Sequence, residues 1–128
     1  MFAYLEQSRA MARGTPIQDP RSREAIAARL KALRMGLGFT QDHMARRLDS
    51  STRGQLWANY EQADRLPRYD TLAQIAQKFG FSVLWILEGR EDQLNAEQAR
   101  TIQLGELRMA EEASRKAGRK RRKKSLSD

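Results

Sequence analysis

The chain has 128 residues, of which 24 are Lys or Arg and 16 are Asp or Glu, so its formal net charge is +8 at pH 7. This length accommodates one domain with appendages. The lack of cysteine excludes disulfides, thiolate metal sites and cysteine nucleophiles, and the single histidine, His43, excludes a site built from several histidines. No run approaches the ~18 apolar residues that cross a bilayer, and the N-terminus lacks the pattern of a signal peptide. We therefore expect a soluble, cytoplasmic protein that needs no metal or other cofactor.

The net charge comes from one basic run near the C-terminus. Eight basic residues lie between Arg115 and Lys124, and without them 16 basic residues stand against 16 acidic ones. The rest of the chain is therefore close to neutral, and total charge alone says little about its partners. The function has to be inferred from the pattern of residues.

The apolar residues divide the chain into four zones. Residues 1–20 contain a Gly-Thr-Pro break and are expected to be an N-terminal extension. Residues 21–90 hold nearly all the large apolar side chains and are expected to form the folded domain. Residues 91–117 are polar and helix-prone, and residues 118–128 are too hydrophilic to bury themselves, so we expect a helical extension followed by a disordered basic tail.

The first two helices of the domain are predicted from apolar spacing. Apolar residues recur at helical intervals from Ile26 to Leu37, and Gly36 and Gly38 mark the expected end of this helix. Thr40 is then expected to cap the second helix, because its hydroxyl can accept a free backbone N–H of the first turn. A polar stretch at 49–54 interrupts the pattern and predicts a turn.

A third helix is predicted at about 54–62, with Trp57 and Tyr60 as its apolar positions. Such aromatic residues can stack on single-stranded bases, but their helical spacing favours packing in the core. Asp70 is expected to cap a fourth helix and Ser82 a fifth. Five short helices joined by tight turns predict a compact all-α domain.

The second and third helices suit a unit that places one helix in a major groove about 12 Å wide while its partner crosses the backbone. Gln41 occupies the first position of the second helix, where its amide and the free backbone N–H groups can reach a phosphate. Amides of Gln and Asn can bind adenine, Arg can bind guanine, and Gly lets a backbone approach closely. Residues of these types lie at the start or on the outer face of the third helix: Arg53, Gly54, Gln55 and Asn59.

Four stretches of the domain match one known pattern, in the same order. They are Phe39-Thr40-Gln41 with Met44-Ala45 and Leu48, then Trp57-Ala58-Asn59-Tyr60-Glu61, then Arg65-Leu66-Pro67-Arg68-Tyr69, and finally the residues from Ile75 to Gly89. Together they resemble the Cro/C1-type (XRE-family) helix-turn-helix of transcriptional regulators, in the form found in lambdoid phage repressors. The resemblance implies a five-helix, lambda-repressor-like domain in a prokaryotic or phage regulator that binds double-stranded DNA.

The resemblance also implies roles for individual residues. It makes Gln41 a phosphate clamp, and Arg68 a side chain that approaches the minor groove, where narrow A·T-rich segments attract arginine. Glu61 matches a position that is mainly structural. The base-edge readers implied by the resemblance are Gly54, Gln55 and Asn59, with Arg53 beside them. Between Leu48 and Glu61 this chain is two residues longer than the family pattern, and we expect the extra residues in the turn.

Two readings stay open for residues 91–117. A weak apolar stripe favours a dimerisation helix, because palindromic operators reward two-fold dimers. The same stripe suits a helix that lies on the domain or in solvent, and Gly105 lowers its helix propensity. The tail is expected either to bind phosphates without sequence preference or to be a solvated end. Its contact residues would be Lys120, Arg121, Arg122, Lys123 and Lys124.

The sequence thus predicts a sequence-specific transcriptional regulator, most simply a repressor that binds a palindromic operator as a homodimer. One alternative is an antitoxin, in which residues 91–117 or 1–20 also bind a toxin or another protein. A second alternative is a protein-interaction module that retains the fold without DNA binding. An enzyme is the least supported class, because no constellation of nucleophile, base and oxyanion donors is present.

Overall fold

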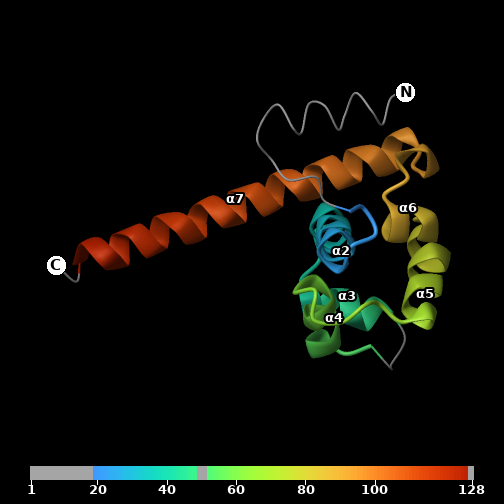
Figure 1. The fold of residues 1–128 in the computed structure, drawn as a ribbon, viewed down its shortest axis with the longest axis horizontal. Coiled ribbons are helices and arrows are strands. Elements are labelled where there is room, and N and C mark those ends of the chain that lie inside the picture. The colour runs from blue at the N-terminus through green and yellow to red at the C-terminus, as the bar shows by residue number, and fades with distance from the viewer. Residues whose placement is uncertain (1–18, 49–51, 127–128) are drawn as a thin grey trace.

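Helices make up the regular structure of the residues that the structure describes (Figure 1). The computed structural model describes residues 19–48 and 52–126, with side chains as far as Arg122. The elements are α2 (Arg23–Leu37), α3 (Gln41–Arg47), α4 (Gly54–Glu61), α5 (Tyr69–Phe79), α6 (Val83–Glu88), the 3-10 helix η1 (Glu91–Gln93) and α7 (Ala96–Leu126). No strand occurs in these described ranges, so the prediction of an all-α fold is confirmed.

Hydroxyl side chains cap three of the described helices, α2 through Ser22 and two others as predicted. The side-chain oxygens of Thr40 and Ser82 each accept a backbone N–H from the first turn of α3 and α6 at 3.1 Å. The prediction that Asp70 caps the fourth helix of the domain is wrong. That helix, α5, already begins at Tyr69, and the Asp70 carboxylate accepts the N–H of Thr71 at 3.0 Å inside the first turn.

The two glycines at the end of α2 have different roles. Gly38 follows the last helical residue with a φ of 80°, a left-handed conformation that glycine adopts without steric cost. Gly36 was expected to mark the same end, but it lies inside α2, one residue before Leu37. Its role is to make room for a neighbouring helix, described below.

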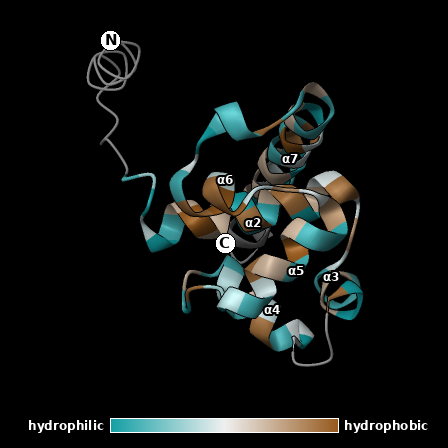
Figure 2. Ribbon diagram, turned by 90° about the vertical axis from the view of Figure 1, so that its right-hand side faces the viewer, coloured by the Kyte–Doolittle hydropathy of each residue, from teal (hydrophilic) through white to brown (hydrophobic). Residues whose placement is uncertain are grey.

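The core consists of large side chains from all the major helices. Fully buried members include Leu30, Leu33, Met44, Trp57, Tyr60, Ile75 and Ile86. In Figure 2 the hydrophobic stretches of α2, α5 and α6 gather at the centre of the view. Burial of Trp57 and Tyr60 confirms that these aromatic residues pack in the core, and Trp85 is buried with them.

α7 begins at a reciprocal cap and continues for 31 residues. Asn95 Oδ1 accepts the N–H of Gln98 at 2.8 Å, and Gln98 Oε1 accepts the N–H of Asn95 at 3.0 Å. The helix runs on through residues 118–126, where a disordered tail was expected, because the Arg and Lys residues of this segment have high helix propensity. None of the described helices, α7 included, is long and apolar enough to span a membrane.

α7 crosses α2 where glycines let the two backbones touch. A Cβ on Gly105 would lie 1.8 Å from the carbonyl oxygen of Ala32, and one on Gly36 would lie 2.1 Å from that of Thr101. Ile102 of α7 is buried in the core beside this crossing. The first half of α7 is therefore part of the folded domain, and Gly105 is needed for that contact despite its low helix propensity.

Candidate nucleic-acid interface

α3 and α4 pack against each other on the side of α2 that faces away from α7 (Figure 1). The connection between them includes residues 49–51, so part of the predicted turn lies outside the described residues. Arg53 precedes α4, and Gly54 is its first residue. A Cβ on Gly54 would lie 2.0 Å from Oδ1 of Asp42 in α3, so this glycine leaves room for the Asp42 carboxylate.

The outer face of α4 carries two amides that lie one turn apart. Gln55 is exposed and donates a hydrogen bond from Nε2 to Oδ1 of Asn59 at 3.1 Å. This bond holds the two side chains in one orientation and leaves free the Asn59 amino group, the Gln55 carbonyl oxygen and one further N–H. Arg53 is exposed beside them and makes no side-chain bond to cap the helix. The arrangement offers donors and acceptors to base edges or phosphates.

Glu61, the last residue of α4, lies at the centre of a buried polar network. Its carboxylate pairs with Arg34 of α2 at two points, Nε to Oε2 at 2.6 Å and Nη2 to Oε1 at 3.0 Å. The indole N–H of Trp57 also donates to this carboxylate. The Glu61 side chain is only 3% exposed. Glu61 therefore has the mainly structural role that the resemblance implies.

Arg34 is a residue that the sequence reasoning missed. Its side chain is 10% exposed, which is unusual for arginine unless the charge is paired. A signal was present, because Arg34 lies four residues after Leu30 and next to Leu33, on the apolar side of the first predicted helix. A charge at such a position predicts a buried partner, although spacing alone cannot say which acid provides it.

The network reaches the predicted phosphate clamp. Gln41 is the first residue of α3, and its Nε2 donates to Oε1 of Glu61 at 3.1 Å. The amide is therefore held in place from within the protein, and one N–H and the carbonyl oxygen of the side chain remain unused by this bond. The geometry gives Gln41 a fixed orientation at the start of the helix, where backbone N–H groups also point outward.

Comparison with known proteins identifies this arrangement. Residues 27–91 match the family described as helix-turn-helix domain, of the XRE/Cro-C1 type, and this span covers about half of the chain. The chain belongs to the helix-turn-helix domain family. Comparisons with curated proteins and with solved structures gave no match. The matched span runs from α2 to η1 and includes α3 and α4, the two helices that the sequence analysis predicts as the helix-turn-helix.

Arg68 lies in the loop that follows the helix-turn-helix. Its side chain is 56% exposed, and its Nε lies 3.4 Å from Oδ1 of Asp70, which is itself 46% exposed. An ion pair this exposed contributes little, so a phosphate can replace Asp70 at small cost. Leu66 and Tyr69 in the same segment are also exposed.

The structure separates the predicted contact residues into two groups. Gln41, Gly54, Gln55 and Asn59 lie together on α3 and α4, with Arg53 beside them and Arg68 in the next loop. Lys120, Arg121 and Arg122 are exposed near the end of α7, which projects past α2 (Figure 1). Lys123 and Lys124 belong to the same helix, but their side chains lie outside the described ones. Within the described part of the chain, no group of three or more His, Cys, Asp or Glu residues can hold a metal ion.

Proposed function

We propose that this helix-turn-helix protein is a sequence-specific, double-stranded DNA-binding transcriptional regulator that inserts α4 into a major groove. The observation that carries the proposal is the outer face of α4, where the amides of Gln55 and Asn59 lie one turn apart, with the exposed Arg53 just before the helix. An α-helix with its side chains is about 10–12 Å across, which suits the ~12 Å major groove. The Arg34–Glu61 pair holds the opposite end of α4 in place, so the reading face has a fixed orientation.

Phosphate contacts and base contacts come from different residues in this proposal. Gln41 binds a backbone phosphate, Arg68 approaches the adjacent minor groove, and the C-terminal cations add affinity without sequence preference. Gln55 and Asn59 discriminate between bases, because their amides can form paired hydrogen bonds with adenine. Glu61 acts as a positioning residue through its bond to Gln41.

We further propose that the regulator is a homodimer and a repressor in a prokaryotic cytoplasm, associated with the nucleoid when bound to DNA. α4 has only 8 residues and can contact only a short run of base pairs. Two copies on a palindromic operator, with half-sites about 34 Å apart, would supply the specificity that one copy lacks. Such a dimer would repress by covering a promoter.

A second candidate is an antitoxin or protein-interaction module built on the same fold. The feature that favours it is a groove of about 780 Å³ between α2, α6 and α7. Its lining combines apolar side chains such as Leu94 and Met109 with charged ones such as Arg29 and Glu106, and this mixture suits a toxin or other protein partner. Co-purification of one stoichiometric protein with the full chain would favour this candidate.

The decisive experiment is selection of random duplex DNA by the full chain at ~150 mM salt, where weak phosphate binding is largely suppressed. A parallel selection uses the double variant Gln55→Ala, Asn59→Ala, and Gln77→Ala serves as an exposed control on α5. We expect a two-fold symmetric motif for the wild type and the control, and a weaker or altered motif for the double variant. Recovery of the same motif by the double variant, or of no motif by the wild type, would overturn the proposal.

A further inference from the structure

The first half of α7 is fixed to the domain at several points. Gly105 brings its backbone against that of α2, and the guanidinium of Arg108 donates to the carbonyl oxygen of Met35. One helical turn later, Lys31 Nζ lies 2.8 Å from Oε1 of Glu112. These contacts fix both the position and the direction of α7, because they are spread over more than one turn.

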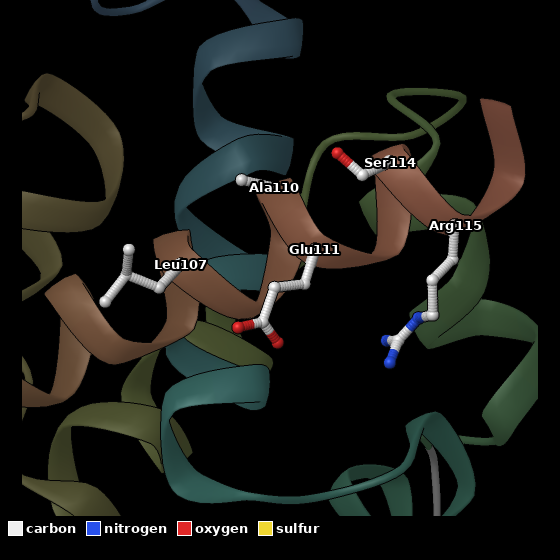
Figure 3. A pocket seen from close by; sticks show the side chains of 5 residues that line it. All are labelled: Leu107, Ala110, Glu111, Ser114 and Arg115. Atoms are coloured by element: carbon white, nitrogen blue, oxygen red, sulfur yellow. The ribbon is translucent and has the colours of Figure 1, made fainter. Parts of the chain in front are cut away.

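Beyond Glu112 the helix leaves the domain and becomes strongly basic. Residues 113–117 and 119–122 are exposed, and this part of α7 projects past α2 in Figure 1. No acidic residue occurs between Glu112 and Asp128. Among the described side chains of this part, only Lys116 has an ion pair, with Glu112 at 3.3 Å. Figure 3 shows the side chain of Arg115 pointing to the same side of α7 as that of Glu111.

The spacing of these charges opposes the helix that carries them. Arg115 and Arg119 lie four residues apart, as do Lys116 and Lys120, so like charges face each other on the helix surface. Such pairs destabilise a helix, and a bound polyanion removes the repulsion. Helix formation in this segment and phosphate binding therefore reinforce each other.

We propose that the basic half of α7 is a rigid arm that binds backbone phosphates of the same duplex, at a fixed offset from the site under α4. The inference rests on the proposed function and adds a second contact of defined position. At 1.5 Å per residue, residues 119–122 lie about 21–26 Å along α7 from Gly105, a length that corresponds to roughly six to eight base pairs for an arm that follows the duplex axis. A flexible tail with the same charges would instead contact many positions equally.

The test is hydroxyl-radical footprinting of four full-chain proteins on the selected operator. They are the wild type, a variant with Arg119, Lys120, Arg121 and Arg122 changed to Gln, and two insertions between Glu112 and Ala113. One insertion, Ala-Ala-Ala-Ala, extends the helix by about 6 Å, and the other, Gly-Ser-Gly-Ser, adds the same number of residues but makes the junction flexible. The insertions keep every charge of the arm.

We expect the wild type to protect a central site and a discrete flanking patch. The alanine insertion should move that patch outward by about two base pairs, and the glycine-serine insertion should spread it until it is no longer resolved. The glutamine variant should lose the patch and reduce the slope of log affinity against log salt by about 3 to 4, since each phosphate contact contributes about 0.9.

Three results would overturn the proposal of a rigid arm, provided that the central protection remains in all four proteins. They are an unchanged patch in the glycine-serine variant, an unchanged salt slope in the glutamine variant, and capture of a second duplex in place of flanking protection. Loss of the central protection in the wild type would instead refute the proposed function. The two failures are therefore distinguishable in one set of footprints.

Discussion

Arg34 and Glu61 form a two-point ion pair that joins α2 to the last residue of α4, with N–O distances of 2.6 and 3.0 Å. The third nitrogen of the Arg34 guanidinium donates to the carbonyl oxygen of Phe39 at 2.8 Å, just before α3. One buried arginine therefore connects three helices, and Gln41 is attached to the same carboxylate. The orientation of the helix-turn-helix depends on this pair as well as on apolar packing.

Removing one partner of this pair should be costly. Arg34→Met leaves the Glu61 carboxylate buried without its cation, and we expect a loss of about 3–5 kcal/mol in the free energy of unfolding. The double variant Arg34→Met, Glu61→Leu should lose less than Arg34→Met alone, because no charge then remains buried. Urea unfolding of both proteins measures this difference.

The matched control is the exposed pair between Arg21 and Glu88, in which the arginine side chain is 72% exposed. Arg21→Met should cost less than about 1 kcal/mol, because solvent already screens that pair. If Arg34→Met cost no more than Arg21→Met, the buried pair would not hold the helices together.

The amide pair on α4 predicts how two substitutions combine on DNA. Asn59→Ala should cost about 1–3 kcal/mol of binding at one base position and relax the preference there. Because Gln55 donates to Asn59, loss of Asn59 also frees the Gln55 side chain. The two substitutions should therefore be non-additive. Competition binding on the operator and its single-base variants tests this, and equal losses on operator and random DNA would contradict it.

Local patterns in the sequence predicted the helices well because helical periodicity and caps involve neighbouring residues. Apolar spacing located α2, and the hydroxyls of Thr40 and Ser82 located the starts of α3 and α6. Asp70 shows the limit of this reasoning. An aspartate in a first turn and an aspartate at the cap give nearly the same sequence pattern, and the difference depends on where the preceding loop places the chain.

Contacts between distant segments could not be predicted in the same way. Arg34 and Glu61 are 27 residues apart, and their pairing depends on how α2 meets α4. From the sequence alone, Gly105 only lowers the helix propensity of its segment, and its role becomes clear only from its close approach to Ala32. The sequence also predicted the residue types of the outer face of α4, but not the bonds by which Gln41 and Gln55 are already held.

Two glycines of α7 should respond in opposite directions to the same substitution. Gly105→Ala places a Cβ 1.8 Å from the Ala32 carbonyl oxygen, so the helices must separate. Overpacking of this kind costs about 1–3 kcal/mol, which exceeds the gain of about 1 kcal/mol in helix propensity. Gly118→Ala meets no atom within 4 Å and should raise helix content without lowering stability. Urea unfolding and far-ultraviolet circular dichroism measure both effects, and a change of the same sign in both variants would contradict the crossing.

Ala63 ends the helix-turn-helix in a conformation that suits glycine better. Its φ is 62°, and the following N–H, of Asp64, reaches back to the carbonyl oxygen of Asn59 at 3.0 Å. A left-handed conformation costs a non-glycine residue about 1 kcal/mol or more, whereas glycine adopts it freely. Part of that gain is lost through the greater entropy of glycine in the unfolded chain. Ala63→Gly should therefore raise the free energy of unfolding by about 0.5–1 kcal/mol.

Ala73→Gly, at an exposed position inside α5, should lower the free energy of unfolding by a similar amount. Urea unfolding of the two variants compares one chemical change at two backbone conformations, and a loss of stability in both would show that Ala63 is not strained.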